Sequence, residues 1–347
     1  MRRLLNKFGP DPREIFKAHK SELVAITGIG NQIAKSVLSW ETYVHLGREK
    51  DRLKEFGVDF LTQESPFYPN LLEELYDSPI GLYWKGTFKV ERPCIGIVGT
   101  RQPSLYGVEV ARKFASGLCE SGFCVVSGLA RGIDTAAHQG ALSVGGPTIA
   151  VLGSGLDLIY PPENKALYDE ICTKGAVITE FPFGRRVDRQ TFPMRNRIIS
   201  GLCQAIIVVE TGVSGGSMIT ARFAGEQGRN LFAVPGRINT HEAQGCHQLI
   251  RDGATLITSV KEILEELNYA CSPKLNEGTQ SKGEEVSVAL SEDEHTILML
   301  LKQGAEGIPD FIANRLGFPI SRVSAVLTCL ELKHLIKKGS DGTFEVS

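Results

Sequence analysis

Seven short runs of apolar residues recur between residues 93 and 260, and longer stretches with helical periodicity separate them. The runs occupy residues 95–98, 124–127, 148–152, 176–179, 205–209, 230–234 and 255–257. A run that is apolar at every position, rather than at every second one, is typical of a strand covered on both faces. Such strands in alternation with helices predict an α/β domain with a Rossmann-like, doubly wound and mostly parallel sheet.

The sequence on both sides of this region favours helices. Residues 1–56 contain short helical patterns around the turn from Ile26 to Gly30, which indicate a helix-hairpin-helix or SAM-like domain; a plain connection in a small bundle fits equally well. The C-terminal part contains helical patterns at residues 292–303, 308–316 and 321–335 and then a hairpin with a polar turn at 339–342. Three helices followed by a hairpin are typical of a winged helix.

The predicted organisation has four parts. They are a helical domain at 1–56, a Rossmann-like domain at 57–270 that begins with an extension, a linker at 271–288 and a winged helix at 289–347. The linker is assigned because residues 272–285 are almost free of apolar side chains. The third helix of the winged helix offers few outward residues for a DNA groove, namely Arg322, Ser324 and Lys333. Protein contact or dimer support is therefore favoured there over binding of duplex DNA.

Composition limits the classes of function. The chain has 347 residues, of which 42% are hydrophobic, and a formal net charge of −2 at pH 7. A nucleic-acid site must then be a local group of cations rather than a generally basic surface. The absence of a signal peptide and of a membrane-spanning apolar run predicts a cytoplasmic protein without a membrane span. The eight cysteines form no CxxC pair, so neither a zinc site nor a disulfide framework is expected.

The loop after the first run carries residue types that hold phosphate. Gly99 would let backbone N–H groups approach an anion, and Arg101 could hold a phosphate bidentately. Thr100 and Ser104 add hydroxyl donors. Neither a GxGxxG dinucleotide fingerprint nor a Walker A sequence occurs here, so the loop predicts a phosphate pocket of another kind.

Two further loops are expected at the same sheet edge. They contribute Gly128, Arg131 and Gly132 after the second run and Gly153 after the third. The carboxyl ends of parallel strands meet at one edge, so Arg131 should lie near Arg101. Downstream, Lys165 and Tyr168 lie one helical turn apart and should face the same way, offering a cation for the DNA backbone and a ring for a base. Taken alone, these two positions fit a solvent-exposed lysine beside a core tyrosine equally well.

The segment 180–197 is the densest cationic and aromatic part of the chain. Its candidate DNA-binding residues are Arg195, Asn196 and Arg197. A solvated charge run does not normally carry phenylalanines, and this one carries Phe181, Phe183 and Phe192, so a binding surface is favoured. The glycine-rich loop at 211–217 indicates either another anion site or close packing of a helix on a strand, with equal weight.

Catalytic constellations are missing from the sequence. There is no G-x-S-x-G elbow, no HExxH and no credible Cys/His pair. Asp134 and His138 are four residues apart on a predicted helix, but a carboxylate at a helix start and a satisfied histidine explain them better than a metal does. We therefore expect no catalytic residue, no metal and no cofactor.

Several motifs in order resemble the DprA/Smf family of DNA-processing proteins. They are Val98–Arg101 with Ser104, Ser127–Asp134 with Ala137 and His138, Ala150–Gly153, Tyr160 and Pro161, Phe192–Leu202 and Phe232–Gly236. The resemblance covers residues 90–260, and the two flanking domains are of kinds that many members carry. Thr179 and the loop after Glu210 depart from the family's usual sequence, which leaves the role of that loop open.

The resemblance implies a bacterial protein, not an enzyme, that binds incoming single-stranded DNA irrespective of sequence, protects it and loads the RecA recombinase during natural transformation. It implies a homodimer formed through the Rossmann-like domain, and single-strand-binding protein is a further candidate partner. Arg101 would grip phosphate beside Gly99 and Thr100, Lys165 would hold a neighbouring phosphate, and Tyr168 would stack on bases. The alternative is a Rossmann-like nucleotide phosphoribohydrolase, with Glu180 or Glu210 as its catalytic carboxylate.

Overall fold

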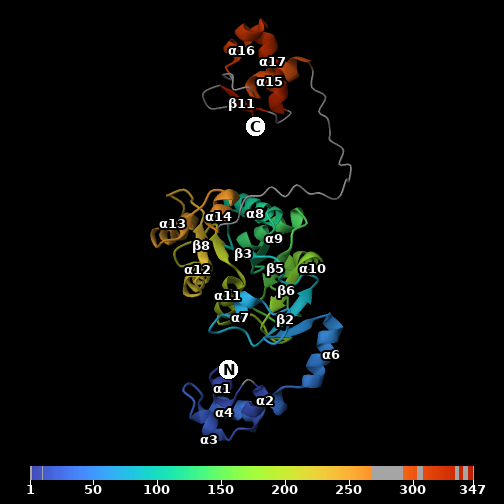
Figure 1. Ribbon diagram of the computed structural model, residues 1–347, viewed down its shortest axis with the longest axis vertical. Coiled ribbons are helices and arrows are strands. Elements are labelled where there is room, and N and C mark those ends of the chain that lie inside the picture. The colour runs from blue at the N-terminus through green and yellow to red at the C-terminus, as the bar shows by residue number, and fades with distance from the viewer. Residues whose placement is uncertain are drawn as a thin grey trace. The chain divides into compact units, whose positions relative to one another are not determined.

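The computed structural model describes residues 2–9, 11–267, 292–302, 308–332, 336–338 and 343–346. Its contacts divide the chain into two units, residues 1–272 and 273–347 (Figure 1). The expected linker and the turn at 339–342 lie outside the described residues. The finer division of the chain into four parts stays a prediction.

The first unit begins with short helices. They are α1 (Arg2–Phe8), α2 (Pro12–Lys17), α3 (Lys20–Val24), α4 (Asn31–Leu38), α5 (Trp40–Tyr43) and α6 (Leu46–Phe56). Leu4, Ile15, Leu23 and Ala34 form a small core of their own among α1 to α4. The longer α6 reaches the sheet region, where Arg52 forms an ion pair of 2.7 Å with the almost buried carboxylate of Asp157.

A sheet of nine described strands forms the centre of this unit. The strands are β1 (Asp59–Thr62), β2 (Gly81–Gly86), β3 (Cys94–Val98), β4 (Cys124–Ser127), β5 (Thr148–Val151), β6 (Ala176–Thr179), β7 (Ala205–Val208), β8 (Asn230–Ala233) and β9 (Thr255–Leu256). Their order is β1-β2-β6-β5-β4-β3-β7-β8-β9. The ladders from β6 to β9 are parallel, and β1 and β2 add an antiparallel edge. All seven predicted strands are confirmed as β3 to β9, and the extension supplies the other two.

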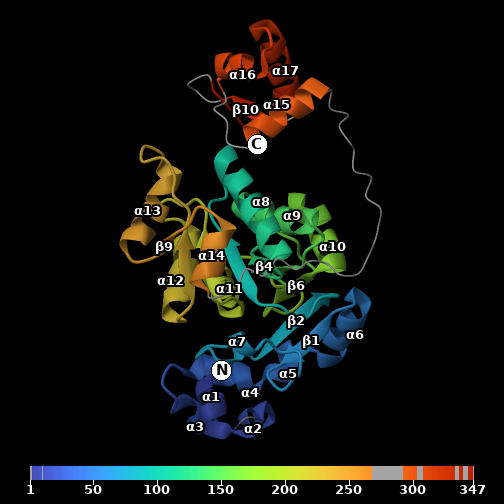
Figure 2. The ribbon, with the colours of Figure 1, turned by 45° about the horizontal axis from the view of Figure 1, so that its top comes forward.

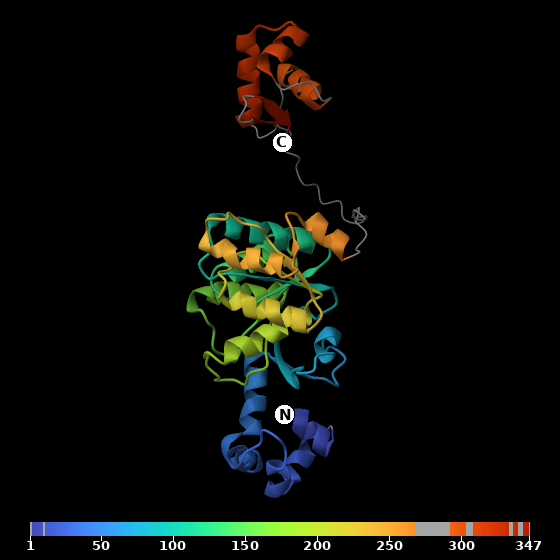
Figure 3. The ribbon, with the colours of Figure 1, turned by 90° about the vertical axis from the view of Figure 1, so that its left-hand side faces the viewer.

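Helices cover both faces of the sheet (Figures 2 and 3). They are α7 (Asn70–Glu73), α8 (Leu105–Glu120), α9 (Ile133–Ser143), α10 (Lys165–Lys174), α11 (Thr191–Leu202), α12 (Gly216–Glu226), α13 (Gln244–Arg251) and α14 (Val260–Glu266). Ile95 and Ile97 of β3 pack against α8 and α9, whereas Val98 belongs to the opposite core, under α11 and α12. The central strands are buried at every position, which is why their sequence is continuously apolar.

The strand order creates a switch point beside β3. From β3 the chain proceeds through β4 and β5 to β6 on one side and then returns to place β7 on the other side. The loops that leave β3 and β7 therefore diverge at the carboxyl edge of the sheet. Open α/β sheets bind their ligands in the crevice that such a divergence leaves.

The second unit contains the predicted helices and hairpin strands. They are α15 (Glu292–Lys302), α16 (Pro309–Leu316), α17 (Ile320–Leu332), β10 (Ile336–Lys338) and β11 (Phe344–Val346). Ile297, Ile312, Val323 and Leu327 form the centre of its core. Arg322, one of the outward candidates, is occupied by an ion pair of 2.7 Å with Asp293, and Lys333 lies outside the described residues. The assignment as a winged helix stays a prediction.

Candidate nucleic-acid interface

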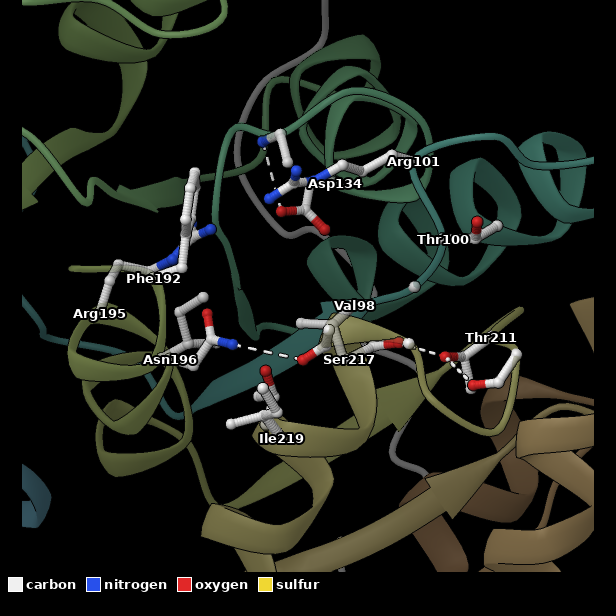
Figure 4. A pocket seen from close by; sticks show the side chains of 17 residues that line it. Val98, Thr100, Arg101, Asp134, Phe192, Arg195, Asn196, Thr211, Ser217 and Ile219 are labelled. Atoms are coloured by element: carbon white, nitrogen blue, oxygen red, sulfur yellow. Dashed lines mark hydrogen bonds between the residues drawn. The ribbon is translucent and has the colours of Figure 1, made fainter. Parts of the chain in front are cut away.

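A cavity of about 340 Å³ opens at the switch point between β3 and β7 (Figure 4). Its lining combines the end of β3, the loop after β7 and one face of α11. The residues in the lining that we expected to bind DNA are Gly99, Thr100, Arg101, Arg195 and Asn196. A narrow second cavity of about 20 Å³ shares Arg101 and Arg195 and adds Gly128, Arg131 and Gly153. The structure thus brings together three of the predicted strand-end loops.

The glycine at the start of the β3 loop serves close packing. A Cβ atom at Gly99 would lie 2.6 Å from Ile133 of α9 and 2.9 Å from the backbone oxygen of Glu210. The Thr100 N–H donates to that same oxygen at 2.6 Å, which fixes the loop against β7. The Thr100 hydroxyl accepts a bond from the Gln102 N–H, so its own proton is left for a ligand.

Arg101 is the exposed cation of the first cavity, and an aromatic ring holds it in place. Its guanidinium carbon lies 4.8 Å from the centre of the Phe192 ring. Such a cation–π contact orients the side chain at low cost, and it leaves the N–H groups at the edge of the guanidinium open to an anion. Phe192 therefore acts as the support of the cation that we expect to bind phosphate.

Arg195 is a buried cation in the wall of both cavities. Its side chain is 5% exposed, and Nη1 donates to the Val151 backbone oxygen at 2.8 Å. The guanidinium lies directly over Gly128, where any Cβ atom would overlap it. Burial lowers the pKa of Arg195, and the nearby Asp134 opposes that shift. Asp134 is buried as well and accepts bonds from the N–H groups of Gly128 and Ala130.

Ser104 does not take the role that we predicted for it. Its hydroxyl donates to Glu210 at 2.6 Å and its N–H donates to the same carboxylate at 2.9 Å. The Ser104 oxygen also accepts from the Gly107 N–H, which caps α8. Ser104 therefore ties α8 to β7, and neither it nor Glu210 lines the cavity. The Glu210 carboxylate accepts both bonds from Ser104 and does not line the cavity. The structure therefore does not position it as a catalytic base there.

Arg197 also does not take the DNA-binding position that we predicted for it. It lines neither cavity and pairs with Glu180, and its Nε lies 3.4 Å from a carboxylate oxygen of Asp77. The side chains of Arg197 and Glu180 are 11% and 13% exposed. Burial raises the pKa of Glu180, and the Arg197 charge opposes that increase. This ion pair gives both residues a structural role, and Glu180 lines neither cavity.

The phenylalanines of segment 180–197 have separate roles. Phe181 and Phe183 are buried, and the Phe183 ring packs at a tilt against Phe56 and edge-to-face against Tyr83 in the core beside α6. Phe192 alone of the three reaches the cavity. The predicted aromatic surface is therefore wrong for two of its three rings, because apolar residues in a polar segment can equally anchor that segment to the core.

Lys165 and Tyr168 do not face the same way. Lys165 is exposed and forms an ion pair with Asp169 at 2.7 Å. Tyr168 is 2% exposed in the core between α10 and the sheet, and its hydroxyl donates to the Leu156 backbone oxygen at 3.0 Å. Burial raises the pKa of this phenol. The expectation that Tyr168 stacks on bases is therefore corrected, since no base can reach its ring in this structure.

A Tyr168→Phe substitution tests whether the hydroxyl of this residue is buried and hydrogen-bonded. The change removes one buried hydroxyl and leaves the Leu156 oxygen without that donor, so we expect a loss of about 1–3 kcal/mol in unfolding free energy. Affinity for single-stranded DNA is expected to remain that of the unmodified protein. Denaturant unfolding and fluorescence anisotropy with a labelled oligonucleotide measure the two quantities. Unchanged stability would contradict the buried, hydrogen-bonded position of the hydroxyl, whereas the affinity does not test stacking because phenylalanine keeps the ring.

The remaining predicted residues support the site from behind or from its rim. Arg131 is exposed and pairs with Glu163. Gly132 has a positive φ of 79° and packs against the backbone of the β3 loop without lining either cavity. His138 is buried, its Nδ1 lies 2.7 Å from the Thr148 hydroxyl, which itself donates to the Val125 backbone oxygen, and burial lowers the pKa of His138 to about 3. The described residues contain no group of three or more side chains that could hold a metal ion.

Sequence reasoning left the loop after β7 undecided, yet this loop forms a whole wall of the cavity. The residues it contributes are Thr211, Gly212, Gly215, Gly216 and Ser217. Its glycines were a signal, but the sequence does not say that β7 lies beside β3.

Among the described residues, none of the helices combines the length and apolar character needed to cross a membrane.

Comparison with known proteins gives one consistent result. Residues 59–268 match the family described as DNA recombination-mediator protein A. The Smf protein of Synechocystis sp. is 39% identical over 77% of this chain and 68% of its own length. The crystal structure of DNA processing protein A from Streptococcus pneumoniae is 36% identical, with a TM-score of 0.65 over 76% of this chain and 95% of that one.

A second structure carries information about a ligand. DNA processing protein A from Helicobacter pylori, whose single-stranded DNA binding mode was studied by structure, is 30% identical to this chain. The TM-score is 0.56, and the match covers 61% of this chain and 96% of that one.

Proposed function

Because this chain belongs to the DprA/Smf family of DNA recombination-mediator proteins, we propose that it binds single-stranded DNA irrespective of sequence at the cavity between β3 and β7. One observation carries the site: Arg101, supported by Phe192, stands at the mouth of a cavity that the switch point of the sheet creates. Arg101 would bind the phosphates of the strand. A phosphate contact is blind to base identity, so affinity should depend on salt more than on sequence.

The proposal extends to the cellular role. The protein would act in the cytoplasm by binding rather than by catalysis, protect incoming single strands and load the RecA recombinase during natural transformation. A homodimer through the α/β domain and contact with single-strand-binding protein belong to the same proposal. The relative from Helicobacter pylori supports the choice of ligand, and the described geometry supports the location.

A binding titration tests the ligand class. The full chain is mixed with labelled oligothymidylate, a mixed-sequence single strand and a duplex of the same length at several salt concentrations. We expect the two single strands to bind alike, the duplex to bind less tightly, and log K to fall linearly with log salt for the single strands. Preference for the duplex, or affinity that does not respond to salt, would exclude the proposed mode.

An Arg101→Ala substitution tests the site. The exposed guanidinium is not needed for folding, and its loss removes one charge-assisted contact of about 1.5–3 kcal/mol, or about tenfold to a hundredfold in affinity. The slope of log K against log salt should fall in magnitude by about 0.7. Arg251→Ala is the matched control, because Arg251 is exposed at the end of α13, which leads to the amino end of β9. Equal affinity of both variants would remove Arg101 from the site.

A further inference from the structure

A carboxylate stands in the wall of the cavity that we propose for phosphate. Among the described side chains that line this cavity, Asp134 is the acidic one, and the cations that share the lining with it are Arg101 of the β3 loop and Arg195 of α11. Figure 4 shows Asp134 among these lining side chains. An ionised carboxylate at this place opposes the binding of phosphate, because like charges repel more strongly where water is excluded.

The start of α9 fixes the position of this carboxylate. The Ile133 N–H donates to the Thr100 carbonyl oxygen at 3.2 Å, so the first turn of α9 is tied to the β3 loop. Asp134 Oδ2 accepts bonds from the N–H groups of Gly128 and Ala130 at 3.2 Å and 3.3 Å. These bonds hold the carboxylate in the wall, so a phosphate that enters has to share the cavity with it.

Burial favours the neutral form of the Asp134 side chain. The residue is 6% exposed, and burial raises the pKa of its carboxyl, while the Arg195 charge and the bonds from neighbouring N–H groups oppose that increase. A phosphate in the cavity would raise this pKa further, since a second negative charge nearby disfavours the ionised carboxyl. The free protein and the complex therefore differ in how strongly this carboxyl holds a proton.

The other charged or titratable groups around Asp134 keep their charge near neutral pH. The two arginines of the lining stay cationic, because a guanidinium does not lose its proton in a protein. Burial lowers the pKa of His138, one turn further along α9, to about 3, so this ring stays neutral. Arg131, on the loop before α9, is exposed and paired with Glu163. Among these groups, Asp134 is the one whose charge can change when a phosphate enters.

We propose that Asp134 takes up a proton from the solvent when a single strand binds, so that the affinity for the strand rises as the pH falls. Oδ2 already accepts two N–H bonds, and the proton therefore goes to Oδ1. The protonated carboxyl no longer repels the phosphate, and its O–H is a donor for a phosphate oxygen. This inference rests on the proposed function, because the phosphate belongs to the strand that Arg101 binds.

The direction of the pH dependence follows from the pKa of Asp134 in the free protein and in the complex. The value in the complex is the higher one, and burial has already raised the value in the free protein. Affinity is therefore greatest below the pKa of the free protein. It falls by up to about tenfold per pH unit between the two pKa values and is constant above the higher one.

Binding titrations of the full chain with 5′-hydroxyl oligothymidylate between about pH 5.5 and about pH 8.5, at constant salt, test the proposal. Neither thymine nor a phosphodiester changes its charge in this range, and a label with pH-independent emission is used, so the protein supplies any pH dependence. We expect the affinity of the unmodified protein to fall by about tenfold or more as the pH rises across the range.

An Asp134→Asn substitution removes the charge and keeps an oxygen that can accept from the Gly128 and Ala130 N–H groups. We expect this variant to bind oligothymidylate about tenfold more tightly than the unmodified protein at the alkaline end of the range and to show little dependence on pH. Tighter binding is the sign of a removed repulsion, since damage to the wall would weaken binding instead. Thermal unfolding checks that the variant is folded.

Two control variants assign the effect to this carboxyl. Histidine side chains titrate in the same range, and the His241 ring lies against Gly212 of the cavity wall, so His241→Gln tests the other source of pH dependence. Glu120→Gln removes an exposed carboxylate at the end of α8, which leads to the amino end of β4. We expect both control variants to keep the decrease in affinity with rising pH.

Calorimetry of the unmodified protein needs no variant. The heats of binding in buffers with different ionisation enthalpies give the number of protons taken up for each chain that binds a strand. We expect an uptake that approaches about one proton where the affinity changes most steeply with pH. The same uptake should remain in His241→Gln and disappear in Asp134→Asn.

The results that would overturn this inference are distinguishable from failure of the proposed function. An affinity that depends on salt but not on pH, or binding without proton uptake, means that Asp134 keeps its charge and that the proposed function stands. The carboxylate only supports the wall if Asp134→Asn keeps the pH dependence or binds more weakly at every pH. If the unmodified protein does not bind oligothymidylate at all, the proposed function and this inference fall together.

Discussion

Replacing Gly132 with alanine is expected to lower the unfolding free energy by about 2–6 kcal/mol and to weaken single-strand binding at the same time. Gly132 has a φ of 79° and a ψ of −124°, a conformation that residues with a Cβ atom rarely adopt. The added carbon would also overlap the Thr100 carbonyl oxygen and lie 2.8 Å from the carbonyl carbon of Arg101. Relief of this clash requires the β3 loop to move, and Arg101 moves with it.

Gly145→Ala separates the two causes. Gly145 also has a positive φ, of 65°, but a Cβ atom there meets nothing within 4 Å. Its substitution should cost only the conformational strain, about 1–2 kcal/mol, and leave DNA binding unchanged. Chemical denaturation and anisotropy titration of both variants give the comparison. Similar losses in the two variants would show that the Gly132 backbone does not support the β3 loop.

Replacing Arg197 with alanine is expected to destabilise the protein by about 3–5 kcal/mol, because the buried carboxylate of Glu180 would lose its counter-ion. The loss should shrink as the pH falls. Without Arg197 the pKa of Glu180 would rise further above its unfolded value, so the carboxyl would protonate in the folded state. A raised pKa stabilises the folded protein only at low pH, and this contribution is lost as the pH rises.

Unfolding measured near pH 5 and near pH 8 checks this expectation. Arg189→Ala is the control, since Arg189 belongs to the same segment but is exposed, and its loss should change stability by no more than about 0.5 kcal/mol. Single-strand affinity of the folded Arg197→Ala protein should match that of the Arg189 control. A stable variant with selectively weakened DNA binding would return Arg197 to the interface.

The strands were predictable because burial on both faces leaves a direct mark on the sequence. Every position of β4, β5 and β7 is buried, so each strand is apolar or small throughout. The order of the strands leaves no such mark. The position of β7 beside β3, which makes the loop at 211–217 a wall of the cavity, depends on how the chain returns across the sheet.

The errors at the candidate site have a common physical cause. Sequence identifies a cation or an aromatic ring, but the orientation of the element decides what it meets. Lys165 and Tyr168 are three residues apart on α10, and the rotation of that helix turns one outward and the other into the core. Arg101 and Arg197 are the same residue type, yet one is offered to a ligand and the other is matched by a carboxylate.

The ion pair between Arg52 and Asp157 connects the N-terminal helices to the loops beside the sheet. Asp157 follows β5 and also accepts a bond from the Gly184 N–H, so it joins the loop after β5 to segment 180–197. A boundary drawn after residue 56 cuts this junction and leaves an almost buried carboxylate without its cation. The helical region then braces the loops beside the proposed DNA site, and we expect these loops to be more mobile in a protein trimmed to the α/β region alone.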